Sequence, residues 1–305
     1  MSRIAYLGPE GTFTEAALRA LESDGLIPAP GPVTRIATDS TPAALAAVRF
    51  GDADFACVPI ENSIDGSVLP TLDSLADGPP VQIYAELTLD VSFTIAVRPG
   101  TAASAVQTVA AFPIAAAQVK RWLAVHLADA ALLPAHSNAA AAAEVAAGRA
   151  DAAVSTALAT QRYGLDALAA DVVDEPNART RFVLVGAPAA PPARTGADRT
   201  SVVLRLANVP GSLAMAMTEL AIRDIDLTRI ESRPTRIELG SYMFFLDFVG
   251  HIDDTPVAEA LRALHRRCAE VRYLGSWPTG DPAGTPPPVT DEAATWLARL
   301  REGAP

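Results

Sequence analysis

Short apolar runs and Ala-rich stretches with helical spacing alternate along the first part of the chain. The segment 39–58, "DSTPAALAAVRFGDADFACV", starts with polar residues typical of a helix cap, continues as an Ala-rich helix and ends in an apolar strand after a Gly-containing turn. The segment 136–155, "HSNAAAAAEVAAGRADAAVS", has the same pattern and aligns with the first without gaps. The pattern therefore predicts an internal repeat of two similar α/β units. The alignment pairs Ser40 with Ser137, Val48 with Val145, Gly51 with Gly148, Asp54 with Asp151 and Ala56 with Ala153.

Another apolar stretch precedes each copy of the repeat, "VTRIAT" before the first and "AALLPA" before the second. Strands and helices that alternate in this way form parallel or mixed sheets with flanking helices, so the expected fold class is α/β. Ligands of such sheets bind beyond the carboxyl ends of the strands, so we expect two facing lobes to share one cleft. The loops that follow the strands are the expected source of ligand contacts, from Thr12, Phe13, Ser63 and Ser155.

The strand "RTRFVLVG" begins with charge although its remainder is apolar. Arg181 carries a guanidinium that can bind a carboxylate through two parallel hydrogen bonds, and Thr180 places a neutral hydroxyl beside it. After the strand "DFACV", Glu61, Asn62 and Ser63 stand in a row and offer donors and acceptors for a carboxylate, carbonyl or hydroxyl. We expect both stretches at the cleft. The alternative, from the residues alone, is a solvated strand start and an ordinary capped loop.

The composition changes after Gly186, where a segment rich in Pro, Ala and Gly is typical of a linker. Strand and helix patterns then follow in the order β-α-β-β-α-β, the ferredoxin-like arrangement, which is more often a binding module than a catalyst. Gly211 and Ser212 permit the backbone to approach a small ligand closely. The expected divisions are 1–188 for a two-lobed domain, 189–199 for the linker, 200–278 for the second domain and 279–305 for a Pro-rich tail with one short helix.

Composition narrows the possible functions. The formal net charge of -11 does not favour nucleic acid or anionic membranes as partners. The chain starts without the pattern of a signal peptide and has no apolar run of about 18 residues, so we expect a cytoplasmic protein. The two cysteines and four histidines are scattered, so no metal site is expected. The only lysine, Lys120, lies in a predicted helix at 115–127, which argues against Schiff-base chemistry.

Five short motifs occur in order along the chain: "YLGPEGTFTEAAL", "ACVPIENSIDGSV", "NARTRFVLVG", "PGSLA" and "IESRP". Together they resemble prephenate dehydratase with a regulatory ACT domain. The resemblance implies a carbon-oxygen lyase that converts prephenate into phenylpyruvate, with loss of carbon dioxide and water, in phenylalanine biosynthesis. It also implies a bilobal domain like that of periplasmic binding proteins, with the site in the cleft and without a cofactor or metal.

The resemblance assigns catalytic roles in the first domain. It makes the Thr of the Thr-Arg-Phe motif, here Thr180, essential, and it places the Asn of the Glu-Asn-Ser motif at Asn62. Because aromatisation drives the reaction, Thr180 is expected to hydrogen-bond the departing hydroxyl as part of a network. Glu61 is the alternative acid if burial raises its pKa.

The substrate contacts implied by the resemblance are Arg181 and Phe182. Family members often carry a Ser-His-Pro-Gln stretch, and the equivalent here is "AFPIAAAQ". Ala111 and Phe112 replace the polar pair, which leaves Gln118 as the remaining polar candidate.

For the second domain, the resemblance implies phenylalanine as a feedback inhibitor bound at a subunit interface, in a homodimer or homotetramer. Preference for arogenate over prephenate and a non-catalytic sensor of aromatic metabolites are the alternatives. The expected effector residues are Asn208, Pro210, Gly211, Ser212, Leu213, Ala214, Glu231, Ser232, Arg233 and Pro234.

Overall fold

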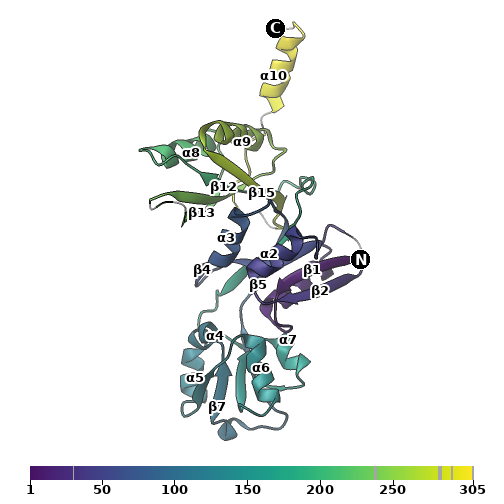
Figure 1. Cartoon of the computed structure of the whole chain (residues 1–305), viewed down its shortest axis with the longest axis vertical. Coiled ribbons are helices and arrows are strands. Elements are labelled where there is room, and N and C mark those ends of the chain that lie inside the picture. Colours follow the sequence, from purple (N-terminus) through teal and green to yellow (C-terminus); the bar gives the residue numbers. More distant parts are fainter. Residues whose placement is uncertain (30, 237, 239, 281–283, 290, 304–305) are drawn as a thin grey trace. The chain divides into compact units, whose positions relative to one another are not determined.

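The computed structural model describes residues 1–29, 31–236, 238, 240–280, 284–289 and 291–303 (Figure 1). The chain divides into two compact units. The first comprises Met1–Ser74 and Leu87–Ala187, and the second comprises Leu75–Glu86 and Pro188–Pro305. Two mixed sheets with flanking helices occupy the first part of the chain, and a separate antiparallel sheet follows. The expected α/β fold class is confirmed.

The first lobe is built on a sheet in the order β2-β1-β3-β11-β5, with the short β4 paired to β3. Helix α1 begins where Thr12 accepts a hydrogen bond from the Glu15 N–H, so the loop 8–14 ends at a helix N-terminus. The strands are β1 (Ser2–Leu7), β2 (Val33–Thr38), β3 (Phe55–Asn62), β4 (Gly66–Ser67), β5 (Gln82–Asp90) and β11 (Arg179–Gly186), and the helices are α1 (Phe13–Ser23), α2 (Thr41–Arg49) and α3 (Leu69–Ala76).

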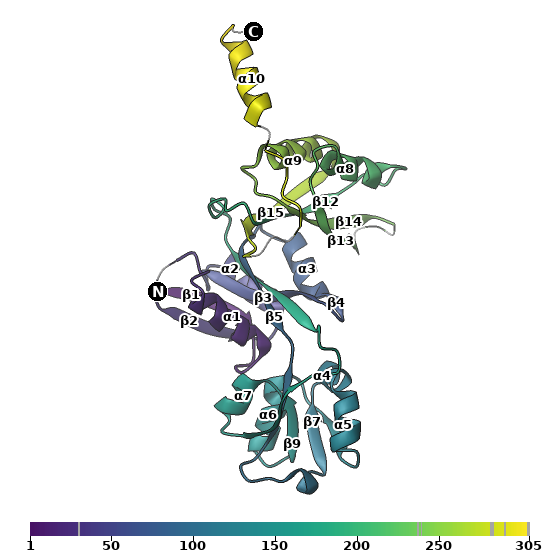
Figure 2. The same ribbon diagram turned by 180° about the vertical axis from the view of Figure 1, so that it is seen from behind.

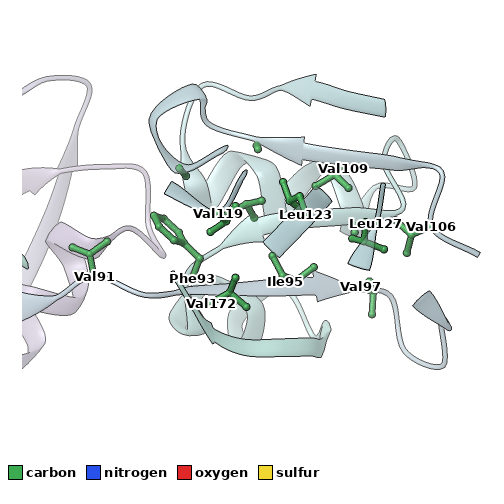
Figure 3. Close-up of a cluster of buried hydrophobic side chains, with 14 of the residues drawn as sticks. Val91, Phe93, Ile95, Val97, Val106, Val109, Val119, Leu123, Leu127 and Val172 are labelled. Atoms are coloured by element: carbon green, nitrogen blue, oxygen red, sulfur yellow. The ribbon is translucent and has the colours of Figure 1, made fainter. Parts of the chain in front are cut away.

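The second lobe has a sheet in the order β10-β6-β9-β7-β8. Its strands are β6 (Phe93–Val97), β7 (Thr108–Ala111), β8 (Ala131–Pro134), β9 (Ala152–Ser155) and β10 (Asp166–Val172), and its helices are α4 (Pro113–Gln118), α5 (Lys120–His126), α6 (Asn138–Ala146) and α7 (Ala157–Arg162), with a 3₁₀ turn at Ala103–Ala105. Alternate strand residues enter two cores. Ile95 and Val109 pack with α4 and α5 (Figure 3), and Ala96 and Ala110 pack with α6. Helices therefore lie on both faces of the sheet (Figure 2).

The internal repeat is present in the structure. β1 lies between β2 and β3 with both pairings parallel, and β7 lies between β8 and β9 in the same way. Ser40 and Ser137 cap the equivalent helices α2 and α6. Asp54 accepts a hydrogen bond from the backbone N–H of Arg3 in β1, and Asp151 accepts the corresponding bond in β7. The two lobes thus share one chain path and one set of connecting contacts.

Both sheets are mixed, one of the two possibilities expected from the sequence, because β11 runs antiparallel to β3 and β6 runs antiparallel to β9. β6 and β11 are the strands next to the two crossings between the lobes, and they lie outside the repeat. One detail differs from the sequence predictions. The single helix predicted at 115–127 is broken at Val119, which is buried and has a φ of -126°. Asp174 accepts hydrogen bonds from the N–H groups of Arg121 and Trp122, which makes α5 a separate helix.

The chain crosses between the two lobes at two adjacent points. β5 continues into β6 through Val91, and the chain returns at Ala178 just before β11. The Val91 N–H donates to the Ala178 carbonyl at 2.7 Å, so the two crossings are hydrogen-bonded to each other. Beside them, Arg179 forms an ion pair of 2.8 Å with Asp90. The two crossings between the lobes thus lie directly beside the first residues of β11.

The C-terminal sheet has the strand order β13-β14-β12-β15, and the chain order β-α-β-β-α-β is the predicted one. Its elements are β12 (Asp198–Arg205), α8 (Ser212–Ala221), β13 (Leu227–Pro234), β14 (Tyr242–Val249), α9 (Thr255–Arg267) and β15 (Glu270–Pro278). Helices α8 and α9 cover one face, where Val202, Leu246 and Phe248 are buried. Helix α10 (Asp291–Arg301) coincides with the helical pattern predicted in the tail.

Candidate active site

Strand pairing brings together the two motifs that begin with Glu61 and Arg179. β3 and β11 are antiparallel, with Asn62 opposite Thr180 and Glu61 opposite Arg181. These residues are 118 to 120 positions apart in sequence. The polar start of β11 therefore has a structural reason, because it faces the polar end of β3.

Asn62 orients the Thr180 hydroxyl. The Asn62 Oδ1 atom accepts hydrogen bonds from the backbone N–H groups of Ile64 (2.8 Å) and Asp65 (3.0 Å), which identifies the other amide atom as Nδ2. Nδ2 donates to Thr180 Oγ1 at 2.9 Å. The Thr180 oxygen is thus an acceptor towards Asn62. Within the described residues its own proton has no acceptor, so it can be donated to a bound molecule.

Arg181 is held by Glu61. Its Nε and Nη2 atoms both donate to Glu61 Oε2, at 3.1 and 2.8 Å. Arg181 is only 8% exposed, whereas the Glu61 side chain is 39% exposed. The guanidinium is therefore fixed in position by a carboxylate of the same chain, and Glu61 is the more accessible of the two.

Ser63 joins the loop after β3 to the start of β11. Its Oγ accepts from the Arg179 N–H at 2.9 Å and donates to the Asn177 carbonyl at 3.0 Å. The Ser63 N–H also donates to the Arg179 carbonyl. Ser63 is thus used in positioning the Thr180 strand.

A cavity of about 560 Å³ lies at the N-termini of α1 and α6. Thr12 and Phe13 line it from the first lobe, and the expected contacts at the loop 8–14 therefore do face a cavity. His136 and Asn138 line it from the second lobe. The Asn138 Oδ1 atom is buried and has no hydrogen-bond partner among the described residues.

Ser155 contacts Asn138, which lines this cavity. It is fully buried, and its Oγ donates to the Asn138 carbonyl at 2.7 Å. It therefore supports the start of α6.

A second cavity, of about 430 Å³, contains Gln118 and Asp65. Gln118 Nε2 donates to Asp65 Oδ2 at 3.3 Å, and Gln118 Oε1 is buried without a partner among the described residues. Because the Asp65 N–H is bound by Asn62, this contact connects Gln118 with the loop that orients Thr180.

The two aromatic candidates are in packed positions. Phe13 makes an edge-to-face contact with Phe93 of the second lobe, with ring centroids 5.6 Å apart. Phe182 is 2% exposed and lies in the core. Asp65, His136 and Asn138 also line these cavities and are not among the residues predicted from the sequence. Their position after a strand or at a helix start was the available signal.

The expected effector residues fall into two groups within the C-terminal unit. Asn208, Ser212 and Leu213 line a cavity of about 120 Å³ beside the start of α8. Gly211 adopts a left-handed φ of 84° at the N-cap of this helix, a conformation that favours glycine. The segment from Glu231 to Pro234 is part of the edge strand β13 and does not line this cavity. Pro210 and Ala214, from the first group, are exposed, as is Ser232 from the second.

The described residues show neither a metal-binding cluster nor a membrane-spanning helix. They contain no group of three or more His, Cys, Asp or Glu side chains arranged to hold a metal ion. Among their helices, none combines the length and apolar composition needed to cross a membrane.

Comparison with known proteins identifies the family. The family model described as prephenate dehydratase matches residues 4–190, and the ACT domain model matches residues 200–266. The chain belongs to the prephenate dehydratase family. It is thus a lyase. The prephenate dehydratase of Mycolicibacterium vanbaalenii is 78% identical over the whole of both chains, and that of Mycobacterium tuberculosis is 68% identical over 100% of this chain and 96% of the relative.

A solved member of the family has the same architecture. The prephenate dehydratase of Arthrobacter aurescens, crystallised in complex with L-Phe, superposes with a TM-score of 0.87 at 38% identity, covering 98% of this chain and 99% of that one. The resemblance drawn from the five motifs is thereby confirmed.

Proposed function

We propose that this chain converts prephenate into phenylpyruvate, with the Thr180 hydroxyl assisting departure of the ring hydroxyl. The carboxylate on the ring leaves as carbon dioxide, and the electron pair of that bond enters the ring. The ring hydroxyl leaves as hydroxide, stabilised by the hydrogen bond from Thr180, and takes one proton from solvent to become water. The observation that carries the assignment is the bond from Asn62 Nδ2 to Thr180 Oγ1, because it leaves the Thr180 proton available to the leaving oxygen.

The remaining site residues position the substrate or support the residues that contact it. Arg181 is fixed by Glu61, so its positive charge is held at a constant place one residue after Thr180 in β11. A fixed cation there stabilises a substrate carboxylate without reorganisation during the reaction. Thr12, Phe13 and Asn138 line the cavity at the two helix N-termini, where an anionic substrate group is favoured. Phe182 and Ser155 act by packing and by supporting this geometry.

For the C-terminal domain we propose phenylalanine as the effector. Support comes from the ACT match and from the L-Phe complex of the Arthrobacter aurescens relative. Because Glu231 to Pro234 lie on an edge strand, a second subunit can approach them, and we propose a homodimer or homotetramer. We also retain the domain divisions at 188, 199 and 278 and a cytoplasmic location as proposals.

The deciding experiment measures phenylpyruvate formation from prephenate, followed by absorbance, with arogenate in parallel. We expect turnover of prephenate and inhibition by added phenylalanine. Greater kcat/KM with arogenate would assign the substrate differently. A protein that binds prephenate without turnover would be a sensor and not an enzyme.

A further inference from the structure

A segment from the middle of the chain is packed into the C-terminal unit. The segment Leu75–Glu86 includes the end of α3 and the first part of β5, but it belongs to the same compact unit as the C-terminal sheet. Arg272 of β15 donates to the Leu75 and Gly78 carbonyls, at 3.3 and 3.0 Å. A Cβ atom at Gly275 would lie only 2.4 Å from the Ile83 carbonyl, so only glycine permits this backbone approach.

Glu86 is the charged residue at the end of this segment. Its side chain is only 7% exposed. Glu86 Oε2 accepts a hydrogen bond of 3.0 Å from Trp277 Nε1 and lies 3.2 Å from Arg199 Nε. A buried carboxylate needs such partners, because an unpaired charge in the interior is strongly destabilising.

Arg199 lies between two carboxylates. Besides Glu86, its Nη1 atom is 3.9 Å from Asp247 Oδ2, while its Nε makes no hydrogen bond of good geometry with any described residue. Asp247 is 1% exposed, accepts a bond from Ser201 Oγ at 2.7 Å, and lies 3.8 Å from Arg229 Nη1. Arg199 can therefore form its closer ion pair with either Glu86 or Asp247. These two pairings would be two discrete arrangements of the buried charges.

The charged residues form a line across the helix-free face of the sheet. Ser201 pairs with Asp247, and Asp247 pairs with Arg229, so these three side chains share one face. Arg229 belongs to β13, and Glu231 follows two residues later on the same face. Glu231 is one of the residues proposed for binding the effector. An amino acid bound there brings both an ammonium and a carboxylate close to the β13 end of the line.

At its other end the line reaches Glu86, and strand β5 continues from there to Asp90. Four residues after Glu86 in β5 comes Asp90, which forms the 2.8 Å ion pair with Arg179. Arg179 directly precedes Thr180. The next residue of the crossing, Val91, is hydrogen-bonded to Ala178. A shift of β5 along its own axis therefore changes the position of the first residues of β11.

We propose that Glu86 is a positioning residue that couples the effector state of the C-terminal sheet to Thr180, through Arg199 on one side and strand β5 on the other. This inference rests on the proposed function, because it requires that phenylalanine inhibits the enzyme. It assigns the coupling to one buried ion pair between this segment and Arg199 of β12.

The test is a phenylalanine titration of the full-length Glu86→Gln variant. Glutamine keeps the size and the acceptor for Trp277 and removes the charge that Arg199 faces. We expect kcat without phenylalanine within about twofold of wild type, and phenylalanine affinity by calorimetry within about threefold. Inhibition at saturating phenylalanine should fall to about twofold or less, since allosteric couplings are typically about 5- to 150-fold and this variant should lose the coupling while keeping the binding.

Asp77→Asn is the matched control. It removes the carboxylate charge that pairs with Arg205. Asp77 lies in the same segment as Glu86, but its side chain is 59% exposed, so the change should leave inhibition unchanged. If Glu86→Gln does not fold, Arg199→Lys replaces it under the same criteria, because it keeps a cation beside Glu86 and removes the guanidinium that lies between Glu86 and Asp247. A folded variant inhibited like wild type overturns the inference. Wild-type protein that phenylalanine does not inhibit contradicts the proposed effector instead.

Discussion

Replacing Thr180 by valine tests the proposed chemistry with the smallest structural change. Valine keeps the branched shape of the side chain in β11 and exchanges the hydroxyl for a methyl group. The only described hydrogen bond of that hydroxyl is the one from Asn62 Nδ2, at 2.9 Å. Asn62 keeps its two bonds to the loop N–H groups, so the loop after β3 should remain in place.

The expected loss in rate is larger than the expected loss in stability. Removing one neutral, partly buried hydrogen bond and leaving its donor unpaired costs about 2 kcal/mol of unfolding free energy. Removing a proton donor from the transition state lowers the rate by about 10²- to 10⁴-fold, which corresponds to about 3–5 kcal/mol. We therefore expect a folded variant with kcat reduced at least about a hundredfold.

The assay is phenylpyruvate formation at saturating prephenate, with thermal unfolding measured on the same samples. Thr180→Ser is the control, because it retains the hydroxyl, and we expect its kcat within about tenfold of wild type. If the valine variant keeps a third of wild-type kcat, or if serine loses as much as valine, Thr180 does not act through its hydroxyl.

Three further outcomes are expected. Gly11→Ala should lower the unfolding free energy by about 1–3 kcal/mol in denaturant titrations. Gly11 has a φ of 91°, and a Cβ atom there would lie 3.0 Å from the Ala159 Cβ. If the variant is as stable as wild type, the loop adapts to the added methyl group. Arg181→Ala should cost about 2 kcal/mol, and Arg179→Ala less than about 1 kcal/mol, since only the first guanidinium is buried; equal melting temperatures would contradict this. A threonine hydroxyl and a backbone N–H donate to Asp151 and hold the pKa of its carboxyl below its ordinary value, so its stabilisation is present above about pH 4 and lost as the pH falls further. The stability difference between wild type and Asp151→Asn should shrink on acidification, and a constant difference would refute the assignment.

Local sequence was sufficient for much of the scaffold. Ser40 and Ser137 are helix caps because their hydroxyls accept bonds from N–H groups three residues later, an interaction that depends on neighbouring residues alone. The repeat of cap, helix, turn and strand was visible for the same reason. Helix α5 was missed as a separate element because Asp174, which caps it, is more than 50 positions away.

The candidate site shows the same division. The types of its residues were evident in the sequence, because Thr180, Asn62 and Arg181 are polar groups beside apolar strands. Their partners were not evident, since the strand register decides that Asn62 faces Thr180 and that Glu61 holds Arg181. Arg181, the arginine expected to contact substrate, is thus also paired with Glu61 within the chain.

The sequence alone determined the α/β repeat, the ferredoxin-like order of the C-terminal elements and the motifs of the family, because these depend on short-range periodicity, caps and turns. Only the tertiary structure decided which hydroxyl proton is available and that Leu75–Glu86 belongs with the C-terminal sheet. Both depend on contacts between residues more than a hundred positions apart, and the free energy of such contacts is set by burial and register, which no local pattern records.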